Sequence, residues 1–73
     1  MMDSTPSNEP LASEKLVSDR KAFFLDLKEN QRGRHLKITE EIAGRRDTII
    51  LPSAAFRDFL ESLARLVEFE SKL

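Results

Sequence analysis

Residues 21–37 read Lys-Ala-Phe-Phe-Leu-Asp-Leu-Lys-Glu-Asn-Gln-Arg-Gly-Arg-His-Leu-Lys, and this stretch decides the fold. Its first half alternates, because apolar Phe23, Leu25 and Leu27 are separated by Phe24 and Asp26. A period of two places alternate side chains on opposite faces of a strand. The first half is therefore predicted to be a β-strand with one apolar face.

The same stretch continues into a turn at residues 30–33, Asn-Gln-Arg-Gly, where Gly33 can adopt a positive φ angle. The alternation then resumes, so residues 21–41 are predicted to form a β-hairpin. Its second face and its turn carry cations, an amide and aromatic rings: Phe24, Lys28, Asn30, Arg32, His35 and Lys37. Basic groups beside aromatic rings on an open sheet favour single-stranded nucleic acid, whose bases stack and whose phosphates contact cations.

Length and composition limit the possible protein classes. A chain of 73 residues forms one domain at most and is marginally stable alone. Without cysteine and with one histidine, it cannot form a disulfide or a multi-histidine metal site within one chain, and no cofactor is expected. Self-association is then the remaining common way to stabilise so small a chain. The absence of a long apolar run or a signal-peptide core predicts a soluble, cytoplasmic protein.

The net charge of -1 conceals a segregation of charge along the chain. Residues 20–46 hold eight Lys or Arg and four acidic residues, a local charge of +4. Residues 1–19 and 47–73 carry -3 and -2. A basic middle between acidic ends favours a polyanionic partner for the hairpin.

The remaining segments complete an α+β fold. Residues 1–10 are predicted to be a disordered leader. Residues 11–20 fit either the start of a helix or a strand, and we choose a strand because it completes a four-stranded antiparallel sheet. The four strands are expected at about 11–19, 21–29, 34–41 and 47–51, with a flexible loop at residues 42–46.

A helix is predicted over residues 53–70, with Ser53 as its N-cap. Its apolar residues recur at spacings of three and four and form one broad stripe. This stripe exceeds what four short strands can cover, which indicates a second copy as partner. The residues expected in this dimer interface are Phe56, Phe59, Leu60, Leu63, Leu66 and Val67.

No catalytic constellation is visible, so no enzyme is expected. His35 lacks an evident orienting partner, and there is no cysteine nucleophile. The arginines of the two loops either are solvated or contact phosphates and bases: Arg32, Arg34, Arg45 and Arg46.

The motifs together resemble a PUR repeat, the module of the Pur-alpha-like purine-rich nucleic-acid-binding proteins, which include bacterial single-repeat members. The resemblance covers residues 11–70 and rests on four runs: residues 21–30, Arg32-Gly33-Arg34-His35-Leu36-Lys37-Ile38, Ile49-Ile50-Leu51-Pro52 and Phe56-Arg57-Asp58-Phe59-Leu60. It implies a Whirly-like unit at residues 11–73, with four antiparallel strands, one helix and two chains intertwined through their helices. A bacterial member would act in the cytoplasm or nucleoid.

The resemblance also implies binding of single-stranded DNA or RNA, often rich in guanine, across the sheet and its hairpin. Lys28 and Asn30 match family positions that contact bases, and Arg34 and Lys37 match basic positions. The family often has Phe where this chain has His35, so strand separation by an inserted ring is less expected than binding.

The sequence is therefore compatible with two functions. The first is a non-enzymatic homodimer that binds single-stranded nucleic acid, in which Phe24 and His35 stack on bases while the cations and Asn30 contact base edges and phosphates. Arg45 and Arg46 support this surface. The alternative is a protein-interaction module whose open sheet face contacts another protein. No membrane or small-molecule partner is expected.

Overall fold

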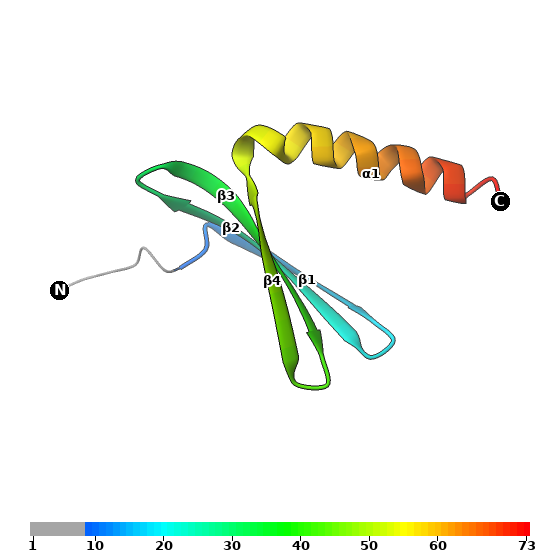
Figure 1. Ribbon diagram of the computed structural model, residues 1–73, viewed down its shortest axis with the longest axis horizontal. Coiled ribbons are helices and arrows are strands. Elements are labelled where there is room, and N and C mark those ends of the chain that lie inside the picture. Colours follow the sequence, from blue (N-terminus) through cyan, green and yellow to red (C-terminus); the bar gives the residue numbers. More distant parts are fainter. Residues whose placement is uncertain (1–8) are drawn as a thin grey trace.

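The computed structural model describes residues 9–73, and residues 1–8 of the predicted leader lie outside this range. Four antiparallel strands in the order β1-β2-β3-β4 form one sheet, and a C-terminal helix follows (Figure 1). The fold class expected from the sequence is thus confirmed, and the segment that fitted either helix or strand is a strand. The elements are β1 (Ala12–Ser18), β2 (Lys21–Asn30), β3 (Gly33–Ile42), β4 (Arg45–Pro52), a 3-10 turn (Ser53–Ala55) and α1 (Phe56–Glu70).

Tight turns of two residues join the strands. The predicted positive φ of Gly33 is present, at 127°, where β3 leaves the β2–β3 turn. In the β3–β4 turn, Ala43 and Gly44 both have positive φ, at 50° and 84°. Two successive positive φ angles suit the right-handed twist of a hairpin. The flexible loop expected at 42–46 is therefore shorter than predicted, because the sheet pairing extends to Ile42 and Arg45.

The strand registers divide the side chains between two faces. Residues that lie directly opposite each other in antiparallel strands point to the same side. On the face next to α1, which we call the apolar face, lie Leu16, Phe23, Leu25, Leu27, Leu36, Ile38, Ile49 and Leu51. On the other face, which we call the open face, lie Lys15, Val17, Phe24, Asp26, Lys28, His35, Lys37, Thr39, Glu41, Arg46, Thr48 and Ile50.

Helix α1 begins later than the sequence predicts. Ser53 starts a 3-10 turn, and the N-cap of α1 is Ala55, which makes no side-chain cap hydrogen bond. The prediction of Ser53 as the helix N-cap is wrong because the chain first makes this 3-10 turn after Pro52. Asp58 lies in the first turn of α1, where a negative charge is favourable.

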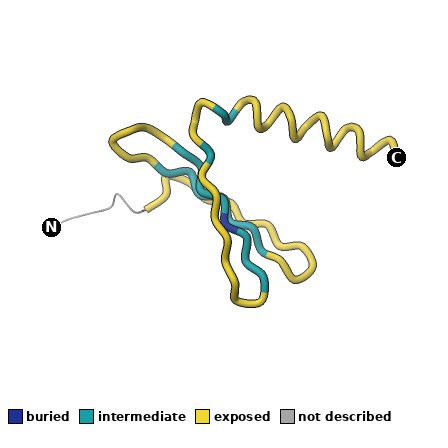
Figure 2. The backbone as a smooth tube through the Cα atoms, in the orientation of Figure 1, coloured by how far each residue is buried: buried dark blue, intermediate teal, exposed yellow. Residues whose placement is uncertain are grey.

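The single chain has almost no core. No hydrophobic residue among residues 9–73 is fully buried, and the buried residue in this part of the chain is Thr39, at 5% exposure (Figure 2). Helix α1 contacts the apolar face at its beginning, where Phe56, Phe59 and Leu63 border a hollow with Leu25 and Leu51. Farther along, the helix extends past the sheet (Figure 1). Its apolar stripe is therefore largely exposed in one chain.

No helix among residues 9–73 is both long enough and apolar enough to cross a membrane.

Candidate nucleic-acid interface

The β2–β3 turn presents Asn30 and Arg32 at one end of the open face. The side-chain Oδ1 of Asn30 accepts a hydrogen bond from the backbone N–H of Arg32 at 2.8 Å. This hydrogen bond stabilises the turn and occupies the side-chain amide oxygen of Asn30 as an acceptor. The NH₂ group of Asn30 keeps two donors for another partner.

Cations and an imidazole follow along the two strands of this hairpin. Lys28 on β2 lies directly opposite His35 on β3, and Lys37 is two residues farther along β3 on the same face. Within residues 9–73, no carboxylate oxygen lies within 4.0 Å of the Nζ atom of Lys28 or Lys37. These two ammonium groups are therefore available to phosphates.

A shallow depression lies beside the turn. Its lining combines four polar residues with a glycine and one apolar residue: Asn30, Arg32, Gly33, Arg34, His35 and Ile50. A surface that offers donors, a flat ring and a hydrocarbon side chain can receive an unstacked base. His35 and Ile50 come from neighbouring strands β3 and β4, so only the folded sheet forms this depression.

Phe24 occupies the middle of the open face and is half-buried. The Nζ atom of Lys15 lies over its ring, 5.3 Å from the ring centre. The guanidinium carbon of Arg46 lies over the same ring at 5.4 Å. Both distances are within the range of cation–π attraction. Three different strands thus bring one aromatic ring and two cations together.

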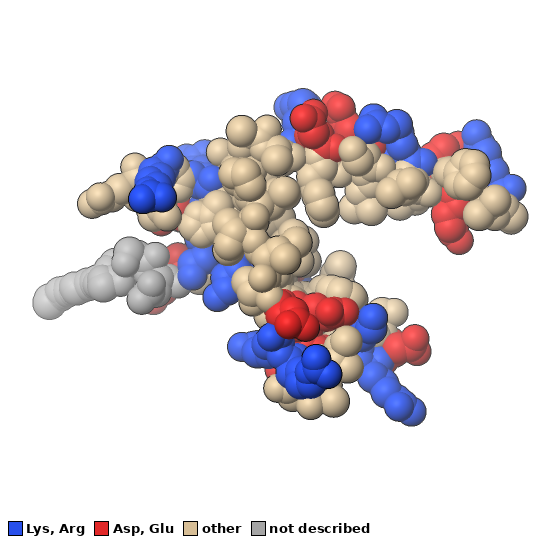
Figure 3. All heavy atoms as spheres, viewed as in Figure 1, with Lys and Arg blue, Asp and Glu red and all other residues tan. Residues whose placement is uncertain are grey.

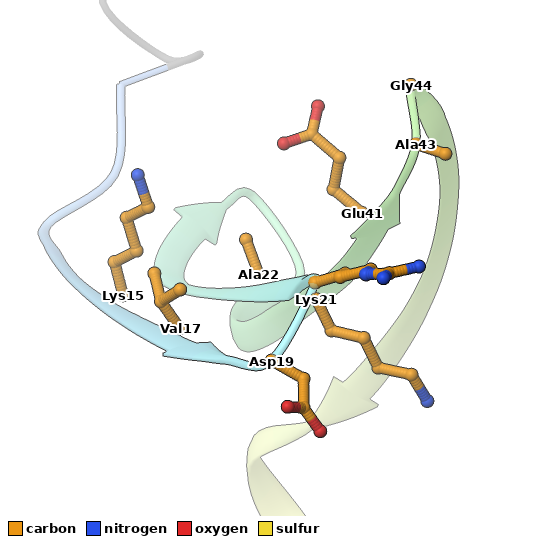
Figure 4. A pocket seen from close by; sticks show the side chains of 9 residues that line it. Lys15, Val17, Asp19, Lys21, Ala22, Glu41, Ala43 and Gly44 are labelled. Carbon is orange, nitrogen blue, oxygen red and sulfur yellow. The ribbon is translucent and has the colours of Figure 1, made fainter.

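The carboxylate of Glu41 holds Arg46 in this position. Its Oε2 atom lies 3.4 Å from Nε of Arg46, and the two residues are directly opposite each other on β3 and β4. Figure 4 shows Glu41, Lys15, Val17 and Ala22 on one side of the sheet and Asp19 and Lys21 on the other. This end of the open face is therefore of mixed charge.

The apolar face holds the other two arginines of the predicted site. Arg34 lies opposite Glu29, and its Nε donates to Oε2 of that residue at 3.3 Å. Arg45 lies opposite Ile42, beside the β3–β4 turn. The residues predicted to bind nucleic acid are thus divided between the two faces. Arg45 lies on the apolar face, and Arg34 shares that face by register while it also borders the depression beside the turn. The remaining predicted residues lie on the open face or its turn: Phe24, Lys28, Asn30, Arg32, His35, Lys37 and Arg46.

Charged groups also line the outward side of α1, whereas the side turned towards the sheet is uncharged over most of its length (Figure 3). The charges of α1 are thus separated from its apolar stripe. This arrangement leaves the stripe suited to protein contact and the open face suited to polar ligands.

Comparison with known proteins assigns this chain to a family. The profile described as "PurA ssDNA and RNA-binding protein" matches residues 2–72. The chain belongs to the PurA family. This assignment confirms the resemblance to a PUR repeat that the sequence motifs indicated.

Several curated relatives of this PurA-family chain are named as transcription factors or regulators. "Transcription factor Pur-alpha 1" of Arabidopsis thaliana is 47% identical over 55 residues, which are 75% of this chain and 19% of the relative. Human "Transcriptional activator protein Pur-alpha" is 37% identical over 65 residues, covering 80% of this chain and 20% of the relative. Human "Transcriptional regulator protein Pur-beta" is 38% identical over 66 residues, covering 89% and 21%. The PurA-family chain spans about a fifth of the length of these relatives.

One residue of this candidate interface, Lys15, was absent from the residues predicted from the sequence. Lys15 lies on β1, the segment for which the sequence left strand and helix open. Taken as a strand, its alternation with Ser13 and Val17 would have placed Lys15 on one face. Its contact with Phe24 depends on the β1–β2 register, which a single strand does not reveal.

Proposed function

We propose that this chain is a non-enzymatic protein that binds single-stranded DNA or RNA through the open face and the β2–β3 turn. The observation that carries the proposal is the arrangement of the hairpin. Lys28, His35 and Lys37 share one face, and no carboxylate lies within 4.0 Å of either ammonium group among residues 9–73. A sheet that presents cations beside rings can contact phosphates and stack on unpaired bases.

Each group at the hairpin has a distinct task in this proposal. Lys28 and Lys37 neutralise phosphates, and Arg32 extends the positive charge into the turn. The NH₂ group of Asn30 donates to a base edge, since its oxygen is engaged by the Arg32 N–H. His35 provides a flat ring on which a base can stack. Arg34, tied to Glu29 on the apolar face, supports the turn.

The names of the family and its relatives support this proposal. The family description refers to single-stranded DNA and RNA. Related proteins described as "Purine-rich element-binding protein gamma" suggest the base preference, which we propose to be for guanine-rich strands. A guanine presents both the carbonyl and the ring nitrogen acceptors that an amide or ammonium donor can recognise.

We also propose that the active form is a homodimer in which residues 11–73 of each chain form one PUR repeat. The single chain lacks a core, since no hydrophobic residue among residues 9–73 is buried. Leu63, Leu66 and Val67 are 50%, 67% and 57% exposed on the stripe of α1. A second copy that packs its helix and apolar face against the first would remove these side chains from water.

Fluorescence anisotropy of labelled oligonucleotides tests the proposed binding. Guanine-rich and oligo-thymidine strands are titrated at two salt concentrations, with a duplex as control. We expect tighter binding of the guanine-rich strand and an affinity that falls log-linearly with salt, because phosphate contacts release counterions. The absence of binding to any single strand at low salt would contradict the proposal and favour a protein-interaction module that uses the exposed Val17 and Ile50 of the open face.

A further inference from the structure

We propose that Phe24, Lys15 and Arg46 form a second nucleotide subsite, separate from the β2–β3 turn, which receives one base and its phosphate. The inference rests on the proposed binding of single-stranded nucleic acid. It places the stacking expected of Phe24 in the middle of the sheet, between two cations, and assigns a role to Lys15, a residue of β1.

The strand registers show that this subsite lies in a cross-strand row of paired residues. Lys15, Phe24, Thr39 and Thr48 form one row across all four strands, since each lies directly opposite the next. Thr39 is the buried member of the row, and its hydroxyl lies 3.2 Å from that of Thr48. The ring of Phe24 therefore stands in a packed part of the sheet, which reduces the entropy lost when a base stacks on it.

The two cations over the ring provide the rest of the subsite. Arg46 presents a planar guanidinium, held by Glu41 at 3.4 Å, on which a base can stack directly. Lys15 lies at 5.3 Å from the ring centre, and its Nζ atom has no carboxylate within 4.0 Å among residues 9–73. Because Glu41 repels a phosphate near Arg46, the phosphate is expected beside Lys15.

Stacking of a base outweighs the contacts that it replaces. An exposed cation–π contact contributes about two- to fivefold to an equilibrium constant. Base stacking on an aromatic ring contributes about 5- to 150-fold per base. A base that displaces one cation from the ring therefore gains affinity, and the displaced cation stays near enough to contact the backbone of the same nucleotide.

This subsite is far from the turn. Asn30 lies six positions after Phe24 on β2, a distance of about 20 Å along an extended strand. One nucleotide cannot contact both positions. A strand long enough to reach both positions gains from linked binding, because the second contact becomes intramolecular.

Tryptophan fluorescence can observe the subsite directly, because the chain contains neither Trp nor Tyr. We would titrate Phe24→Trp with a guanine-rich strand of about 12 nucleotides, within the range of known single-strand site sizes. We expect quenching that follows the anisotropy of the labelled strand. The matched control is Phe69→Trp, since Phe69 is 63% exposed on α1, away from the open face, and its fluorescence should stay constant.

Affinity provides the second readout. Phe24→Leu keeps an apolar side chain but loses the stacking ring, and its affinity for the long strand should fall about 5- to 150-fold. Arg46→Ala should also weaken binding, which gives a second variant if Phe24→Leu does not fold. Tight binding without quenching in Phe24→Trp and unchanged affinity in Phe24→Leu or Arg46→Ala would overturn the subsite and leave the hairpin site intact. A wild-type chain that binds no strand would instead overturn the proposed function as well.

Discussion

Arg45 and Arg46 are adjacent in the chain but lie on opposite faces of the sheet. Arg46 lies over the ring of Phe24 at 5.4 Å on the open face, whereas Arg45 lies opposite Ile42 on the apolar face. This separation follows from the pleat, because successive side chains of a strand point to opposite sides. Two residues of the same type therefore provide a matched pair for mutagenesis.

Exchange of each arginine for alanine should have different effects on nucleic-acid binding. We expect Arg46→Ala to weaken the affinity for a guanine-rich strand about five- to tenfold, because it removes a stacking plane and a cation. Arg45→Ala should change the affinity by less than about twofold, since long-range attraction is screened by salt. Anisotropy at a fixed salt concentration measures both. An equal loss of affinity in the two variants would indicate that net charge, rather than the position of a cation on the open face, determines binding.

Lys28→Ala should weaken binding and reduce its salt dependence. Lys28 has no carboxylate within 4.0 Å among residues 9–73, so its loss removes one phosphate contact and breaks no ion pair. The slope of log affinity against log salt should decrease in magnitude by about 0.7. The control is Lys72→Ala, since Lys72 lies at the end of the chain and pairs with Glu68 at 3.6 Å. If the slope of log affinity against log salt is unchanged in Lys28→Ala, Lys28 does not contact a phosphate.

Leu66→Asp should dissociate the proposed dimer. Leu66 is 67% exposed in one chain, and its burial by a second copy would contribute about 1.5–3 kcal/mol per side chain. Because a symmetric dimer contains two such side chains, the dissociation constant should rise by at least about a hundredfold. Light scattering after size-exclusion chromatography measures the mass. Arg65→Ala is the control, since Arg65 bonds to Ser62 on the same helix and should keep the dimer intact.

If the wild-type chain has the mass of a monomer at micromolar concentration, the dimer proposal is refuted, whatever the effect of Leu66→Asp. The binding proposal has its own readout and is tested independently.

Ala43→Asn should stabilise the fold. Ala43 has a φ of 50°, a left-handed conformation that costs an alanine about 1–2 kcal/mol and that asparagine tolerates better. We expect the free energy of unfolding to increase by about 0.5–1 kcal/mol, seen as a thermal midpoint about 2–8 °C higher by circular dichroism. The protein concentration must be held constant, because the stability of a dimer depends on it.

Gly44→Ala, a substitution at the next position of the same turn that should destabilise the fold, is the control. Gly44 has a φ of 84°, and a Cβ added there would meet no atom within 4 Å. Gly44→Ala should therefore lower the midpoint through backbone strain alone. A higher midpoint in Gly44→Ala, or a lower one in Ala43→Asn, would contradict the role assigned to the turn.

Much of the open face follows from local patterns of the sequence. The alternation of Phe23, Leu25 and Leu27 predicted which face of β2 is apolar, and the turn before Gly33 determined the pairing of the hairpin. Lys28, His35 and Lys37 could therefore be assigned to one surface. The apolar stripe of α1 followed from its helical period, and its excess over the sheet was visible in the sequence.

The start of the helix and the exact length of the last turn could not be predicted. Ser53 has the chemistry of an N-cap, but the chain makes a 3-10 turn there, and Ala55 takes the N-cap position. The β3–β4 turn shortened to Ala43 and Gly44 because strand pairing satisfies more backbone hydrogen bonds than a longer loop would.

The sequence by itself determined the strands of the two central hairpins, the apolar and open faces, and the broad apolar stripe of the helix, because these depend on periods of two and 3.6 residues within short segments. Only the tertiary structure decided that Lys15 of β1 and Arg46 of β4 meet over Phe24, and that Arg34 and Arg45 lie on the other face. The physical reason is register. Contacts between strands depend on which residues lie opposite each other, and a shift of one residue would exchange the faces.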